Sequence, residues 1–249
     1  MKHLLILTLP LAIALMGPAG DEPKYQGKSA SEWIKALDDE DSTKRGLAVI
    51  ALGKIGSPEA IDALIGSLRD NDHRVRNAAA FALGDVKAKA VPTVLVALKH
   101  DDVKVRIGAA RALAYIRPEG ANATESLAQA FKDKDAGVRA EVAFALGQIG
   151  PKATKAVPAL LPGLKDDDNK VRVQAAFALW KIARRPEGIR VLIDSLEDND
   201  FQVRVASALV LGEVGHDAKD AVPRLTSALN DANEDVREAA AQALEKIQD

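Results

Sequence analysis

The chain has 249 residues, of which 47% are hydrophobic, 28% are charged and only 4% are aromatic. Such a composition is typical of helices that pack through small and branched side chains. The formal net charge is −2 and cysteine is absent, so disulfide bonds are excluded and a clustered basic surface for nucleic acid is not expected.

The first nineteen residues predict a secretory signal peptide. Lys2 precedes an apolar run from Leu4 to Leu15, and small, turn-prone residues follow this run. The run is shorter than the roughly 20 residues that span a bilayer, and Pro10 interrupts it. We therefore expect cleavage after Ala19, a linker over residues 20–29, and a periplasmic or secreted protein with no membrane span after cleavage.

An arginine recurs at intervals of 30 to 33 residues through the rest of the chain. The seven copies are Arg45, Arg76, Arg106, Arg139, Arg172, Arg204 and Arg237. A leucine follows each arginine after seven residues and Ile or Val after ten, which places these apolar side chains on one stripe of a helix. Four residues before each arginine stands Asp, or Asn in the last copy, where a helix N-cap is expected.

Between these long helices the leucine spacing predicts a second, shorter helix in each repeat. Pro58, Pro92, Pro158 and Pro223 lie near the expected starts of four of them, where a missing amide proton costs little. Ser29 and Glu32 form a capping-box pattern at the start of the first copy. Each repeat is thus a helical hairpin, and hairpins that cannot bury their apolar stripe alone stack into a superhelix. We predict an all-α solenoid of about seven repeats over residues 30–249.

The repeats resemble a known family. Stretches such as Val75–Gly84 (VRNAAAFALG) and Val138–Gly150 (VRAEVAFALGQIG) are similar to HEAT repeats of the phycobilisome-lyase-like subclass. The resemblance covers about residues 30 to 249 and implies that the longer helices line a concave wall. It says little about function, because such repeats serve as scaffolds, lyase subunits and enzyme domains alike.

No catalytic, metal or cofactor site is predicted. The repeated Asp and Arg residues occur in every unit, which favours caps and hydrogen bonds between successive repeats over a catalytic pair. The histidines are scattered over turns, and the His-Glu dipeptides of di-iron HEAT-like hydroxylases do not occur. A Gly-x-Ser-x-Gly elbow is also missing. We therefore expect a protein that is not an enzyme and carries no cofactor.

The side of each long helix opposite the core stripe carries large apolar residues. If this side faces the concave groove, these residues are candidates for binding a protein or peptide partner. They are Phe81, Ile107, Tyr115, Phe144, Val173, Phe177, Trp180 and Leu209. The alternative is that tight curvature presses the phenylalanines against neighbouring helices and makes them an inner layer of the core.

The sequence thus favours an extracytoplasmic, non-catalytic scaffold that binds a protein or peptide partner on its concave face. Two alternatives stay open. The resemblance to phycobilin lyase subunits implies that the groove could handle a tetrapyrrole, and a purely structural spacer would bind nothing.

Overall fold

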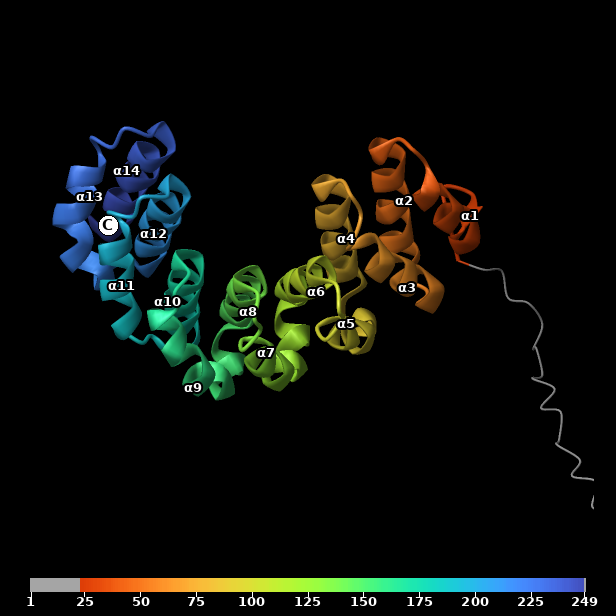
Figure 1. Ribbon diagram of the computed structural model, residues 1–249, viewed down its shortest axis with the longest axis horizontal. Helices are drawn as coiled ribbons and strands as arrows, with labels where there is room; N and C mark the ends of the chain where they lie inside the picture. Colours follow the sequence, from red (N-terminus) through yellow and green to blue (C-terminus); the bar gives the residue numbers. More distant parts are fainter. Residues whose placement is uncertain (1–22, 249) are drawn as a thin grey trace, which may run out of the picture.

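The computed structural model describes residues 23–248, except the side chains of residues 118–120. The predicted signal peptide, residues 1–19, lies outside the described residues. The described part of the chain forms an open arc of stacked helical hairpins (Figure 1). An all-α solenoid was predicted, and the structure confirms it.

Seven long helices line the inner side of the arc and follow one another directly along it (Figure 1). They are α2 (Ser42–Ile55), α4 (His73–Val86), α6 (Val103–Ile116), α8 (Ala136–Ile149), α10 (Asn169–Ala183), α12 (Phe201–Val214) and α14 (Glu234–Gln248). Each contains one of the recurring arginines, so the repeat predicted from the sequence is confirmed.

Seven shorter helices precede them and form the outer side of the arc. They are α1 (Ala30–Lys35), α3 (Pro58–Ser67), α5 (Val91–Ala97), α7 (Thr124–Ala130), α9 (Val157–Leu160), α11 (Glu187–Ser195) and α13 (Val222–Ala228). Short 3₁₀ turns connect many of the helices: η1 (Ala36–Asp38), η2 (Lys87–Ala90), η3 (Arg117–Ala123), η4 (Gly150–Ala156), η5 (Leu161–Lys165) and η6 (Gly215–Ala221).

A small hairpin precedes the first helix, where only a linker was expected. Strands β1 (Lys24–Tyr25) and β2 (Lys28–Ser29) pair antiparallel around a turn in which Gly27 has a positive φ of 77°. The indole nitrogen of Trp33 donates a hydrogen bond of 3.1 Å to the carbonyl oxygen of Tyr25. This bond attaches the hairpin to α1.

Side-chain caps start the long helices as predicted. The carboxylates of Asp41, Asp72, Asp102, Asp135, Asp168 and Asp200 accept hydrogen bonds from first-turn amides of their helices. The side-chain oxygen of Asn233 does the same for Val236 in α14. Each bond satisfies an amide that has no partner within the helix.

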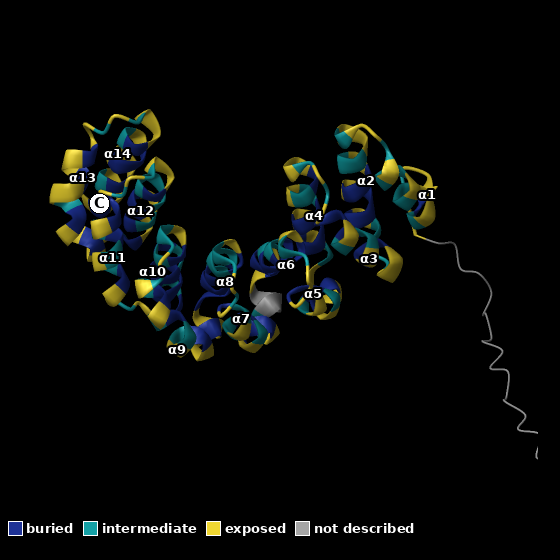
Figure 2. Ribbon diagram, in the orientation of Figure 1, coloured by how far each residue is buried: buried dark blue, intermediate teal, exposed yellow. Residues whose placement is uncertain are grey.

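The core is a continuous row of leucines between the two layers of helices. The leucine seven residues after each of the first six arginines is completely buried, while Leu244 in α14 is half-buried. Figure 2 shows the buried residues on the sides where helices meet and the exposed residues on the outer faces. The buried residues form two clusters, one over α2 to α10 and one over α10 to α14, and the clusters meet at α10.

The division coincides with a change at one position of the repeat. The position eight residues after the arginine is glycine in α2, α4, α8 and α12, where the next long helix comes close. A Cβ atom on Gly53 would lie 2.8 Å from Cβ of Ala82, and one on Gly212 would lie 3.0 Å from Cα of Ala243. In α10 the same position is Trp180, which is buried against α12. A large side chain thus occupies the position where the long helices α2 to α8 and α12 carry glycine or alanine, and α10 and α12 touch over a shorter stretch than the other consecutive long helices.

None of the helices between residues 23 and 248 combines the length and the apolar composition that crossing a bilayer requires.

Candidate functional site: the concave wall

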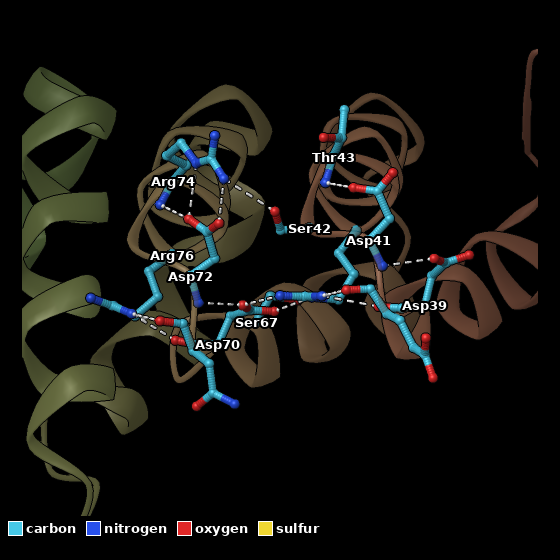
Figure 3. Close-up of polar contacts among 12 residues, drawn as sticks. Asp39, Asp41, Ser42, Thr43, Ser67, Asp70, Asp72, Arg74 and Arg76 are labelled. Atoms are coloured by element: carbon cyan, nitrogen blue, oxygen red, sulfur yellow. Dashed lines mark hydrogen bonds and ion pairs between the residues drawn. The ribbon is translucent and has the colours of Figure 1, made fainter.

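Four of the seven recurring arginines connect neighbouring repeats through aspartates, the kind of contact that the sequence indicated. Arg45 donates two hydrogen bonds of 2.8 Å to the carboxylate of Asp70 in the next repeat, and its third nitrogen donates to two carbonyl oxygens in front of its own helix. Equivalent pairs are Arg106 with Asp133, Arg139 with Asp166 and Arg204 with Asp231. We call this series the arginine ladder. Figure 3 shows the surroundings of its first aspartate, Asp70, together with the capping residue Asp72 and with Arg76, which donates to the carbonyl oxygen of Asp70.

The aspartate that pairs with each arginine of the ladder is not the aspartate that caps the long helix. Asp70 lies two residues before the capping Asp72 and accepts from the Asp72 amide as well as from Arg45. Hydrogen bonds from the arginines hold the pKa of Asp70, Asp166 and Asp231 below its usual range. Each of these carboxylates accepts hydrogen bonds from an arginine and from a backbone amide, which agrees with a structural role.

The described residues contain no group of three or more His, Asp or Glu side chains arranged to hold a metal ion.

The N-terminal half of the concave wall carries an exposed apolar patch. The exposed fractions are 48% for Ile50, 55% for Phe81 and 41% for Tyr115. The rings of Phe81 and Tyr115 meet edge to face with their centres 5.5 Å apart. Gly84 makes this approach possible, because a Cβ on it would lie 2.4 Å from Cβ of Tyr115. Leu47, 57% exposed, extends the patch on α2.

In the middle of the wall, on α8 and α10, the apolar residues that were expected to be exposed are buried or half-buried. Phe144 is half-buried and stacks on Phe177 with ring centres 6.1 Å apart. Val173, Phe177 and Trp180 are buried, with exposed fractions of at most 7%. For Phe177 the packed alternative therefore holds, and Val173 and Trp180, expected on the exposed side, are buried as well, because the close packing of α8 on α10 and the contact of α10 with α11 and α12 cover them. Ile107 is half-buried.

A cleft of about 400 Å³, here called the middle cleft, opens beside Phe144. Its lining comes from α6, α8, α10 and α12 and includes Arg111, Tyr115, Glu141, Lys170, Gln174 and Gln202. The guanidinium of Arg111 pairs with Glu141 and also donates to Asn77, and the hydrogen bond with Glu141 raises the pKa of Arg111. Lys170 lies 3.6 Å from a carboxylate oxygen of Asp200. Both cations of the middle cleft are thus paired with acids of the chain.

A second cleft of about 540 Å³, the C-terminal cleft, lies between α12 and α14. Phe201, Val205 and Leu209 of α12 form one side, and Asp235, Glu238 and Gln242 of α14 form the other. Phe201 and Leu209 are 40% and 42% exposed. Gln202 and Ala206 line both clefts, so the two clefts are neighbours along the wall.

The sequence prediction missed Leu47, Phe201 and the acids of α14 as members of this surface. A signal for Phe201 is present, since residues 201, 205 and 209 are spaced by four and must share one side of a helix. The candidate binding residues were taken only from positions that follow each arginine, whereas Phe201 stands three residues before Arg204.

Comparison with known proteins agrees with the fold. A model of HEAT repeats matches residues 30–103, 91–180 and 157–245. A search of curated proteins gave no match. The complex of CpcE and CpcF of phycocyanin lyase from Nostoc sp. PCC7120 is similar, with 25% identity, a TM-score of 0.56, and coverage of 93% of this chain and 98% of that chain.

A chain in the structure of Kap95p with RanGDP aligns with a TM-score of 0.59 at 14% identity, covering 87% of this chain and 36% of that one. At this identity the likeness concerns the fold alone. The matched repeats extend over most of the chain and coincide with the helical hairpins of the structure. The chain therefore belongs to the HEAT-repeat family.

Proposed function

We propose that the protein is an extracytoplasmic, non-catalytic scaffold that binds a protein or peptide partner on its concave wall. The observation that carries the proposal is the set of large apolar side chains exposed on that wall: Leu47, Ile50, Phe81, Tyr115, Phe201 and Leu209. Exposed apolar surface of this kind marks interaction sites, and aromatic residues are favoured anchors at interfaces.

The apolar patch and the two clefts follow one another along the concave wall, which favours a partner of extended shape. The apolar patch on α2, α4 and α6 leads into the middle cleft through Tyr115, and the middle cleft leads into the C-terminal cleft through Gln202 and Ala206. A surface that crosses several repeats suits a helix or an extended segment better than a small molecule, which favours an enclosed pocket.

Site-specific photo-cross-linking tests this proposal. A photoreactive phenylalanine analogue replaces Phe81 or Leu209 on the concave wall, or Val96, which is 74% exposed and belongs to α5, one of the helices on the outer side of the arc (Figure 1). We expect one cross-linked partner from both concave positions and none from Val96. Equal capture from all three positions, or none from the concave ones, would contradict the proposal and favour the spacer.

Loss-of-binding variants complete the test. Phe81→Ser, Tyr115→Ser and Leu209→Ser change only exposed side chains, so the fold should survive them. We expect the combined variant to lose the partner while Val96→Ser keeps it, with circular dichroism showing equal helix content in both proteins.

The extracytoplasmic part of the proposal rests on the signal-peptide pattern of the first nineteen residues. Cell fractionation of the full chain with a C-terminal tag, followed by N-terminal sequencing, tests it. We expect the mature protein outside the cytoplasm with Gly20 as its first residue. A cytoplasmic protein that keeps Met1 would disprove this part alone.

A second candidate function is the handling of a tetrapyrrole, which the similarity to the phycocyanin lyase complex favours. The middle cleft offers Tyr115 and Phe144 for stacking, but its two cations are already paired with carboxylates. Carboxylate side chains of a tetrapyrrole would have to compete with these pairs. Visible absorbance of the protein purified from its native cells distinguishes the two functions, since a scaffold should show no chromophore band.

A further inference from the structure

We propose that the C-terminal cleft binds an amphipathic helical segment of the partner protein that carries apolar residues along one side and Lys or Arg beside them. This inference rests on the proposed function and specifies the chemistry of the partner at one place on the wall.

The apolar side of the cleft has the geometry of a helix-binding stripe. Phe201, Val205 and Leu209 are spaced by four residues and lie on one side of α12. At 1.5 Å per residue the stripe is about 12 Å long, which corresponds to about two turns of a second helix. A partner helix with apolar residues at positions i, i+4 and i+7 would cover the stripe.

The opposite side of the cleft is acidic. Asp235 and Glu238 of α14 line it and are exposed, and no cation is present among the residues that line the cleft. Neither carboxylate forms an ion pair with a described residue. The Gln242 amide donates a hydrogen bond of 3.1 Å to Glu238, which holds the Glu238 carboxylate along α14.

The two clefts therefore differ in electrostatic character. In the middle cleft Arg111 is neutralised by Glu141 and Lys170 lies beside Asp200. In the C-terminal cleft two negative charges stand beside an apolar stripe, and no described residue forms an ion pair with either of them. Of the two, Asp235 lies in the first turn of α14, where the helix dipole already favours a negative charge. Glu238 is thus the carboxylate that a basic partner residue would neutralise best.

A binding assay with designed peptides tests the inference without knowledge of the natural partner. The first probe is a fluorescent helical peptide with Leu at i, i+4 and i+7 and Lys at the flanking positions, and the second has Glu in place of each Lys. Binding to the chain from residue 20 to 249 is measured by fluorescence anisotropy at low and at high NaCl. We expect the Lys peptide to bind at least about tenfold more tightly at low salt, and the difference to shrink as salt screens the charges.

Charge reversal locates the site. Glu238→Lys should weaken binding of the Lys peptide by about tenfold and improve binding of the Glu peptide, whereas Leu209→Ser should weaken both. The matched control is Asp194→Lys, an exposed acid of α11, which is one of the helices on the outer side of the arc (Figure 1). It changes the net charge equally and should leave both affinities within about twofold.

Equal binding of the two peptides, or an equal effect of Asp194→Lys and Glu238→Lys, would overturn the inference. The cross-linking experiment on Phe81 and Leu209 is independent of it. If a partner is captured at these positions but the Lys peptide is not preferred, the proposed scaffold function stands and only the basic helical segment is rejected. A Lys-peptide preference removed by Glu238→Lys supports the inference even before a natural partner is found.

Discussion

Arg139 donates two hydrogen bonds of 2.8 Å to the carboxylate of Asp166, which precedes the long helix of the next repeat. Its remaining nitrogen donates to the carbonyl oxygen of Asp133, in front of its own helix. One guanidinium therefore fixes the start of α8 relative to the start of α10. Because both partners of this pair are largely covered, the interaction should contribute measurably to stability.

Asp166→Asn should lower the free energy of unfolding by about 1–2 kcal/mol, since it replaces a charged acceptor by a neutral one while keeping an oxygen for the Asp168 amide. Urea unfolding followed by circular dichroism measures the change. Asp167→Asn is the matched control, because Asp167 is exposed and its side chain makes no hydrogen bond within residues 23–248. An equal loss in both variants would show that the ladder pair contributes nothing specific.

The same pair predicts a pH dependence. The hydrogen bond from Arg139 lowers the pKa of Asp166 from its ordinary value of 3.8. A carboxylate with a lowered pKa in the folded protein contributes its stability fully above the ordinary value and loses it as pH falls through the lowered one. The difference in unfolding free energy between the wild type and Asp166→Asn should therefore be constant from neutral pH to about pH 5 and should shrink below about pH 4. A difference that grows in acid would contradict this assignment.

Glycine at the close contacts of the long helices should be intolerant of a methyl group. Gly84→Ala places a Cβ 2.4 Å from Cβ of Tyr115, so α4 and α6 must separate, at an expected cost of about 1–3 kcal/mol. Gly46→Ala is the control, because Gly46 also lies inside a long helix but has nothing within 4 Å of the added atom. It should stabilise the protein by about 0.5–1 kcal/mol through helix propensity. Thermal unfolding of both variants gives the comparison.

Replacement of Trp180 should let α10 and α12 approach each other. The chain contains no cysteine, so spin labels on Gln174→Cys and Gln202→Cys report this separation without interference. We expect a shorter distance in Trp180→Leu than in the wild-type background, because a smaller side chain stands between the helices. The control pair, Gln202→Cys with Glu238→Cys, lies on α12 and α14 and should not change. Two unchanged distances would show that Trp180 does not set the spacing.

The fold could be predicted almost completely from the sequence, because the same residue pattern recurs in each repeat. The capping Asp, the arginine and the leucine seven residues later define a long helix, and all of the predicted caps are present in the structure. Local chemistry and a 3.6-residue period decide these features, and neither depends on how strongly the solenoid curves.

The candidate site could be predicted only in part. Phe81 and Phe177 occupy the same position in their repeats, yet one is 55% exposed and the other 4%. The difference depends on how closely the neighbouring long helix packs, and this in turn depends on the residue facing each ring. Helical periodicity shows which side of α10 carries Phe177 but not how far α8 reaches over it. The close approach of α8 at Gly147, where the Phe177 ring lies against the glycine, decides that.

The arginine ladder has a consequence for how such a chain can change its length. Each pair joins residues only 25 or 27 positions apart, and no pair extends beyond the next repeat. A duplicated segment such as residues 135–167, inserted after residue 167, would bring its own Arg139 together with its own Asp166 and leave the original pair intact. Gene duplication in whole repeats therefore adds no unpaired charge to the interior. The concave wall can therefore lengthen by one long helix at a time, whereas an insertion of part of a repeat between the two members of a pair would change their separation of 25 or 27 positions.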